Sequence, residues 1–170
     1  MYRNAPAGEA TVALYRCRTT AGEHFDSWHP GCEGQETEFL LGHVRAYAPL
    51  VRHVQPDRPG DHWSSVGGVP SGYRAEGRIG VLSLVERPDT RPLYACLDGV
   101  DAFSSLAADC EGARQVRLLG WIRTRALPDE TGYELRRCRV TSTGERFDST
   151  DASCEGQTVD MSLGHLLRRL

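Results

Sequence analysis

Six side chains in this sequence have the polar or aromatic character with which proteins hold sugars. An aromatic ring covers the apolar face of a sugar, while carboxylate, guanidinium and imidazole groups form hydrogen bonds with its hydroxyl groups. The candidate ligand-binding residues with these properties are Trp28, His62, Tyr73, Trp121, Arg146 and Asp148. The alternative for each of them is an ordinary half-buried position at the rim of the fold.

Patterns that support catalysis are missing from the sequence. It contains no nucleophile elbow, no His-Glu-x-x-His helix and no phosphate-binding loop. Carboxylates such as Asp26 and Glu33 recur at equivalent positions along the chain. Recurrence indicates a structural role rather than a single tuned acid–base pair. We therefore predict no catalytic residue, no metal ligand and no cofactor, and we do not expect an enzyme.

The candidate residues are set in a sequence pattern that occurs four times. Each copy has a leucine near its start, then an aromatic residue, a Glu-Gly pair and a late glycine, as in Leu14, Phe25, Glu33-Gly34 and Gly42. Such repetition is typical of folds built from equivalent units. We predict a leader segment at 1–12 and a single repeat domain at 13–170, with repeats at about 13–48, 49–91, 92–133 and 134–170.

The six cysteines occupy two equivalent positions in repeats one, three and four. Repeat two has His53 and Ala75 at these positions, so it lacks both cysteines together. Six cysteines allow about 15 pairings, but paired presence and paired absence select bonds within repeats. The predicted disulfides are Cys17–Cys32, Cys96–Cys110 and Cys138–Cys154. Metal binding is the alternative, and the absence of any Cys-x-x-Cys disfavours it.

The cysteines and the net charge indicate the compartment of the protein and exclude some classes of binding partner. Disulfides persist in oxidising compartments, so we expect a secreted protein whose export leader has been removed. A net charge of −3 gives no attraction to nucleic acid or to anionic membranes, and no apolar stretch is long enough for membrane insertion. All 20 basic residues are arginine, which is typical of GC-rich genomes such as those of actinobacteria.

Short segments with β-strand character alternate with turn-forming residues in each repeat. In repeat one we predict strands at 15–19, 24–27 and 37–44, and no segment of the chain shows sustained helical periodicity. Repeat two has extra residues between Ser65 and Glu76 and fewer residues between Gly77 and Gly80. We therefore expect its third strand to be shortened.

The repeats resemble a secreted repeat family of uncharacterised function. Its units run Pro-Leu-Tyr-Arg, a Gly-Asp-His-Phe hairpin, Tyr-x-Glu-Gly and a final strand with glycine, which match residues 49–52, 60–63, 73–77 and 79–80. Repeats one, three and four resemble a cysteine-bearing actinobacterial variant, with Cys-Glu-Gly-Gln at 32–35 and 154–157. The resemblance implies an accessory, non-catalytic module, and it supplies no catalytic residue.

Repeats of short strands predict an all-β fold. Four complete units favour a small four-bladed propeller-like ring, and a β-trefoil is the alternative because repeats of this length build trefoils. The predicted function is lectin-like recognition of a glycan or cell-envelope polymer. The alternatives are a protein–protein adaptor in a secreted assembly, toxin or enzyme complex, and an inhibitor of a secreted protease.

Overall fold

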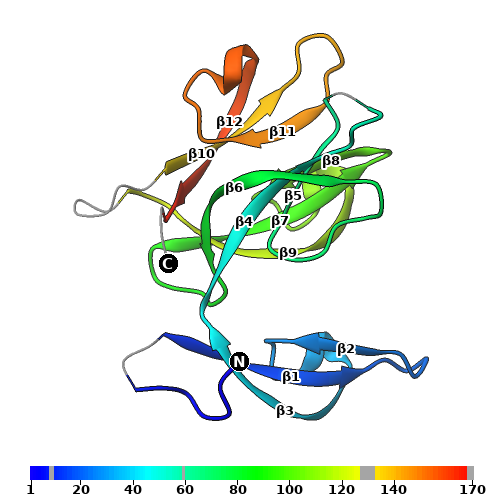
Figure 1. The fold of residues 1–170 in the computed structure, drawn as a ribbon, viewed down its shortest axis with the longest axis vertical. Helices are drawn as coiled ribbons and strands as arrows, with labels where there is room; N and C mark the ends of the chain where they lie inside the picture. Colours follow the sequence, from blue (N-terminus) through cyan, green and yellow to red (C-terminus); the bar gives the residue numbers. More distant parts are fainter. Residues whose placement is uncertain (8–9, 59, 127–132, 168–170) are drawn as a thin grey trace. The chain divides into compact units, whose positions relative to one another are not determined.

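The chain is an all-β protein in which antiparallel strands alternate with tight turns, as the sequence predicts (Figure 1). The computed structural model describes residues 1–7, 10–58, 60–126 and 133–167. The chain divides into two compact units: unit 1 is residues 1–47 and unit 2 is residues 48–170. Unit 1 holds repeat one, and unit 2 holds repeats two to four. The expectation of a single repeat domain at 13–170 stays a prediction.

Unit 1 is a three-stranded sheet in the order β2-β1-β3. Its elements are β1 (Thr11–Arg18), β2 (His24–Ser27), the 3₁₀ turn η1 (Cys32–Gly34) and β3 (Glu36–Arg45). Strand β2 has the predicted bounds, whereas β1 begins at Thr11 and so includes the last two residues of the predicted leader segment 1–12. Within the same unit, Tyr2 forms an antiparallel bridge with His43.

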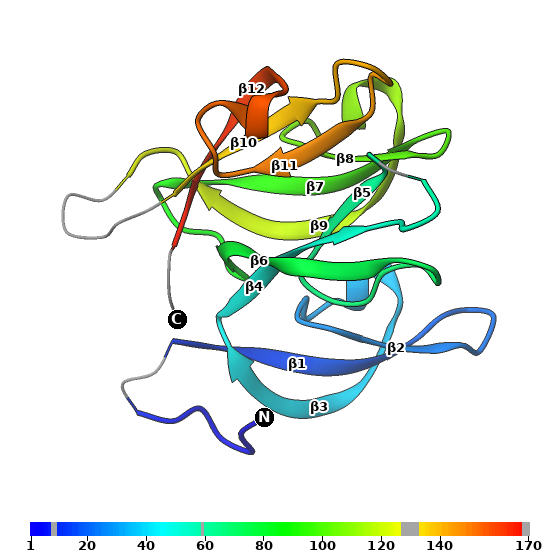
Figure 2. The ribbon, with the colours of Figure 1, turned by 45° about the horizontal axis from the view of Figure 1, so that its top comes forward.

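Unit 2 contains the same three-strand arrangement three times (Figures 1 and 2). Within repeats three and four, the first strand pairs with both strands that follow it. Repeat two consists of β4 (Tyr47–Val54), β5 (His62–Ser65) and β6 (Arg74–Ser83). Repeat three consists of β7 (Thr90–Asp98), β8 (Asp101–Ser105), η2 (Cys110–Gly112) and β9 (Arg114–Arg123). Repeat four consists of β10 (Tyr133–Arg139), β11 (Arg146–Ser149), η3 (Cys154–Gly156) and β12 (Thr158–Leu166).

The third strand of repeat two is not shortened, so that prediction is wrong. Strand β6 has 10 residues, as many as β3 and β9. In the bridged repeats the Cys-Glu-Gly segment forms a 3₁₀ turn before the third strand, whereas Ala75, Glu76 and Gly77 lie within β6. No cysteine ties this segment of repeat two to the first strand, so the segment is extended and forms part of the third strand.

The three predicted disulfides are confirmed, each within one repeat. Each closes a turn whose cysteine and glutamate both have positive φ, 52° and 56° for Cys154 and Glu155. Positive φ is uncommon for residues other than glycine and costs of order 1 kcal/mol for each. The bridge therefore holds a strained turn in place, and this turn fixes the position of the glutamate.

The core of unit 2 is made of equivalent leucines from its repeats. Leu50, Leu93 and Leu135 of the first strands are completely buried, and so are Leu119 and Leu163 of the third strands. Full burial of one leucine side chain is worth about 2 kcal/mol. The recurring aromatic residues pack against the bridges: Phe103 against Cys96–Cys110, and Phe147 against Cys138–Cys154.

The late glycines mark where neighbouring repeats of unit 2 join. The residue after each of these glycines pairs with the strand end of another repeat: Trp121 with Ser83, His165 with Arg123, and Val81 with Leu167. A Cβ atom on Gly120 would lie 2.6 Å from the carbonyl oxygen of Ser83, so only glycine permits this approach. The joins connect repeat two to three, three to four, and four to two.

Candidate binding site

A buried arginine links repeat four to repeat three. Arg137, on β10, donates hydrogen bonds to both carboxylate oxygens of Glu111, at 2.7 and 3.0 Å, and to the carbonyl oxygen of Ser104 at 3.2 Å. Its Nε donates to Asp160 at 2.6 Å, and its side chain is 5% exposed. The hydrogen bond from Arg137 lowers the pKa of Glu111 to about 2.

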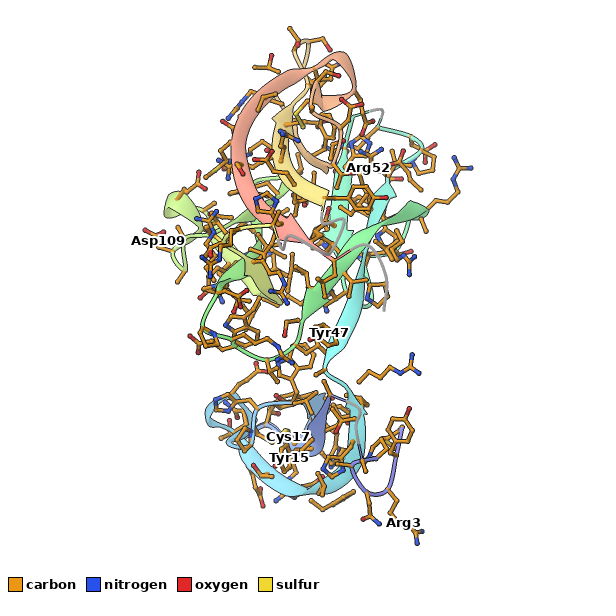
Figure 3. All side chains as sticks on the ribbon, turned by 90° about the vertical axis from the view of Figure 1, so that its left-hand side faces the viewer. Arg3, Tyr15, Cys17, Tyr47, Arg52 and Asp109 are labelled. Atoms are coloured by element: carbon orange, nitrogen blue, oxygen red, sulfur yellow. A yellow bond between two sulfur atoms is a disulfide. The ribbon has the colours of Figure 1, made fainter. Side chains whose placement is uncertain are left out.

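Arg52 makes the same link between repeat two and repeat four (Figure 3). It donates to the carboxylate of Glu155 at 2.6 and 3.2 Å and to the carbonyl oxygen of Asp148 at 3.2 Å. Repeat three has Ala95 at the equivalent position, so it lacks this arginine. Sequence reasoning missed these arginines, although each stands two residues after a core leucine.

Two of the six candidate residues stack on the aromatic residue of another repeat. The ring of His62 lies 5.3 Å from the ring of Phe147, and the guanidinium of Arg146 lies 3.5 Å from the centroid of the Phe103 ring. Arg146 also donates to Asp101 at 2.6 Å. The side chains of His62 and Arg146 are 15% and 11% exposed, so most of their surface serves packing between repeats.

Asp148 lies in the interior, where β5, β8 and β11 contact one another. The hydroxyl group of Ser104 donates to its carboxyl group at 2.5 Å. Burial raises the pKa of Asp148, since the ionised form loses its hydration. Asp148 is 2% exposed and therefore does not form part of the surface that a ligand can reach.

Tyr73 belongs to a group of polar residues that we name the acidic–tyrosine cluster, comprising Arg58, Asp61, Tyr73 and Glu145. The Tyr73 hydroxyl donates to Asp61 at 2.7 Å. Arg58 contacts the carboxylates of Asp61 at 3.2 Å and of Glu145 at 3.8 Å. Burial, followed by the hydrogen bond to Asp61, raises the pKa of Tyr73. Burial, followed by the charge of Asp61, raises the pKa of Glu145.

The cluster brings three of the six candidates to one region. His62 follows Asp61 in the chain, Arg146 follows Glu145, and the charge of His62 acts on the Glu145 carboxyl group. The Tyr73 ring is half-buried and the Glu145 side chain is 20% exposed, so both are accessible from solvent. Carboxyl oxygens beside an aromatic ring can hold a polyhydroxylated ligand.

The two tryptophan candidates are not part of this cluster. Trp28 is half-buried in unit 1, which is a separate compact unit. Trp121 is half-buried on β9, where its backbone lies in register with Pro92 and Ser83. Sequence reasoning did not select Asp61 or Glu145, because their proximity depends on how repeats two and four meet.

The arginine links predict that unit 2 loses stability in acid. The folded state holds the pKa of Glu111 at about 2, below its ordinary 4.5, and Arg52 lowers the pKa of Glu155 in the same way. Their stabilisation is therefore complete above the unfolded pKa and is lost as pH falls from 4.5 towards about 2. The raised pKa values of Glu145 and Asp148 act in the opposite direction.

Thermal melting across this pH range measures the effect. Glu111→Gln should be less stable than the native protein at neutral pH, and its melting temperature should fall less as the pH is lowered. The matched control is Glu23→Gln, which replaces an exposed glutamate in the turn between β1 and β2. Equal acid sensitivity of Glu111→Gln and the native protein would show that the Arg137–Glu111 pair does not contribute to it.

Comparison with protein-family models, with curated proteins and with solved structures found no match. Within the described ranges, no helix is long and apolar enough to cross a membrane. In the same part of the chain, no group of three or more histidine, cysteine, aspartate or glutamate side chains is arranged to hold a metal ion. The three disulfides indicate an oxidising environment.

Proposed function

We propose that the protein is a secreted, non-catalytic module that recognises a glycan or a cell-envelope polymer. The observation that carries this proposal is the acidic–tyrosine cluster, in which Tyr73 and Glu145 reach solvent and the buried Asp61 accepts the hydrogen bond of the Tyr73 hydroxyl. An aromatic surface with a few fixed oxygen atoms matches the two faces of a sugar.

The internal contacts of the cluster favour binding. Asp61 is fixed by Tyr73 and Arg58, and Arg58 also contacts Glu145. Groups held in place before the ligand arrives lose less conformational entropy when it binds. Burial and then the charge of Asp61 raise the pKa of Glu145, and its carboxyl oxygens accept hydrogen bonds.

The same contacts support a role without chemistry. Both carboxyl groups of the cluster contact Arg58, and Asp61 is buried under Tyr73. A general acid–base pair needs two carboxyl groups with distinct environments facing a substrate, and Asp61 is already occupied by its own side-chain partners. The three disulfides support the proposal of secretion, because disulfides persist outside the reducing cytosol.

We further propose that repeats two, three and four close into a three-repeat ring of the β-trefoil type. Support comes from the three strand-end pairings at Trp121, His165 and Val81, which connect these repeats in a cycle. The mutual contacts of β5, β8 and β11 agree with three-fold closure. This ring uses the late glycines of all three repeats, so a four-bladed propeller becomes the less favoured closure.

An adaptor that binds another secreted protein is the second candidate function. Tyr73 and Asp61 belong to repeat two, which differs most from the other repeats because it lacks the bridge and its turn. A lectin built from repeats tends to keep similar sites in several of them, whereas a protein partner can use a single divergent repeat. Three of the four residues of the cluster belong to this one divergent repeat, and this observation favours the adaptor.

A glycan array and a pull-down from secreted proteins, both run with the native protein and with Glu145→Gln, test the two functions. Loss of one hydrogen bond to the ligand should weaken glycan binding by about tenfold. Glu23→Gln in unit 1 is the matched control and should bind normally. The adaptor function would replace the lectin function if no glycan bound and if the native chain captured a protein that Glu145→Gln did not capture. Equal ligand binding by Glu145→Gln and the native protein would show that the binding site lies elsewhere.

A further inference from the structure

Repeat one has the core residues of the other repeats, but they are not fully buried. Leu14 and Leu41 stand where repeats three and four have Leu93, Leu119, Leu135 and Leu163, all of which are 0% exposed. Leu14 and Leu41 are only half-buried. The face of unit 1 that corresponds to the shared core of unit 2 therefore remains partly open to solvent.

The aromatic residues of repeat one show the same difference. Phe25 is half-buried, whereas its equivalents Phe103 and Phe147 are each 5% exposed. Phe39 is 56% exposed. By strand register, Phe39 is equivalent to Arg117, which faces Ala95 as Phe39 faces Arg16. Arg117 donates a hydrogen bond to Ser65 of the neighbouring repeat, so this position contacts a neighbour in unit 2.

Repeat one also contains both the arginine and the glutamate that form the ion pairs between repeats in unit 2. Arg16 stands at the position of Arg137, and Glu33 stands at the position of Glu111. Ser27 donates to Glu33 at 3.0 Å, as Ser105 donates to Glu111 at 2.7 Å, and the φ angles of the two glutamates are 56° and 59°. The Glu33 carboxyl group therefore has the same local geometry as the carboxyl group that binds Arg137.

The arginine of repeat one, however, remains near the surface. The Arg16 side chain is 37% exposed and pairs with Asp26 of its own repeat at 3.1 Å, whereas the Arg137 side chain is 5% exposed and reaches another repeat. In unit 2 the arginine of one repeat binds the glutamate of the repeat that precedes it in the cycle of repeats two, three and four. One surface of repeat one thus offers the arginine and another offers the glutamate, which is the arrangement of a head-to-tail interface between identical subunits.

We propose that three copies of this chain associate through repeat one, with Arg16 of each copy bound to Glu33 of the next. The interface would bury Leu14, Phe25 and Leu41, which provides the driving force. Closure at three copies follows the way in which repeats two, three and four join within unit 2. The proposal does not depend on the nature of the ligand, and three copies would add avidity to whatever the cluster binds.

Association requires an exchange at the strand edge of repeat one. Tyr2 and His43 form two backbone hydrogen bonds of 2.7 Å, at the edge where Trp121 and His165 pair with a neighbouring repeat. In the trimer the end of β3 of the neighbouring copy would take the place of Tyr2. The two hydrogen bonds between Tyr2 and His43 are replaced by two to the neighbouring copy. Apolar burial and the Arg16–Glu33 contact therefore determine whether the trimer forms.

The mass of the full-length chain in solution, measured by light scattering and sedimentation over a wide range of concentration, tests the proposal. The expected species has three times the mass of the 18.8-kDa chain at high concentration and dissociates on dilution. A monomer at every concentration would overturn the proposal, because the open face would then be covered within the chain or remain open. A dimer would equally overturn it.

Charge reversals identify the interface. Arg16→Glu and Glu33→Arg should each weaken trimer formation by at least about tenfold. The double variant Arg16→Glu/Glu33→Arg should restore it, because every interface would then contain an opposite pair. The matched control is Arg18→Glu, which makes the same charge change at a residue that pairs with Glu36 within its own sheet. Trimers that are unaffected by the single reversals would overturn the proposed contact.

Discussion

Replacing Arg137 with alanine should lower the free energy of unfolding of unit 2 by about 3 kcal/mol. Removing one partner from a buried ion pair costs about 3–5 kcal/mol, because the other charge is left without compensation. Arg137 has two such partners, Glu111 and Asp160, and its side chain is 5% exposed. Glu111 is 41% exposed and regains some hydration, which places the expected loss at the lower end of the range.

Chemical denaturation of the native protein and of Arg137→Ala measures this loss. The matched control is Arg18→Ala, whose side chain is 46% exposed and pairs with Glu36; solvent screens an exposed pair of this kind, so its loss should change the stability little. Arg137→Met keeps most of the side-chain volume and separates packing from charge. Adding Glu111→Gln to Arg137→Met should recover part of the stability, because it removes an uncompensated charge. A loss for Arg137→Ala no larger than that for Arg18→Ala would contradict the proposed role of the link.

The disulfide pairing was predictable because it depends only on comparison within the chain. His53 and Ala75 replace both cysteines of repeat two together, so each cysteine position identifies the other. The comparison needs no knowledge of how repeats pack. The strands predicted at 24–27 and 37–44 match β2 and β3 closely, because turn residues and β-forming segments are local signals, whereas β1 begins four residues before the predicted 15–19.

Residues that act between repeats were not predictable in this way. Arg137 binds Glu111 of the preceding repeat, and the sequence does not state which repeats lie side by side. Asp148 was selected as a polar candidate at the rim of the repeats, yet it lies where β5, β8 and β11 meet and accepts a hydrogen bond from Ser104. Glu145 and Asp61 are far apart in the chain and come close together where repeats two and four meet, and Arg58 contacts both.

The error at β6 has a different physical origin. Glu76-Gly77 matches the Glu-Gly pair of the bridged repeats, and the few residues between Gly77 and Gly80 predicted a shortened third strand after this pair. The turn in those repeats has positive φ at the cysteine and the glutamate, a conformation that the disulfide holds in place. Where the disulfide is absent, the same dipeptide adopts the extended conformation of β6. The Glu-Gly pair is thus a true feature of all four repeats, but its conformation depends on a disulfide that repeat two lacks.

Removing the Cys138–Cys154 bridge should destabilise unit 2 by more than chain entropy alone predicts. The bridge closes a loop with a sequence separation of 16, for which the chain-entropy model gives about 3 kcal/mol. Alanine at both positions avoids unsatisfied polar groups in a site where both cysteines are 0% exposed. The bridge also holds the turn that presents Glu155 to Arg52, so we expect a total loss of about 4 kcal/mol.

A double-mutant cycle with Arg52→Met separates the two contributions. If the bridge positions Glu155 for Arg52, its removal already weakens the ion pair, and the combined loss should be smaller than the sum of the two separate losses by about 1 kcal/mol. Replacing Cys96 and Cys110 with alanine in the presence of Arg52→Met is the matched control, because that bridge holds Glu111, the partner of Arg137. These losses should be additive. Additivity in the Cys138–Cys154 cycle as well would mean that the bridge acts on the unfolded chain alone, and that the η3 turn keeps its shape without it.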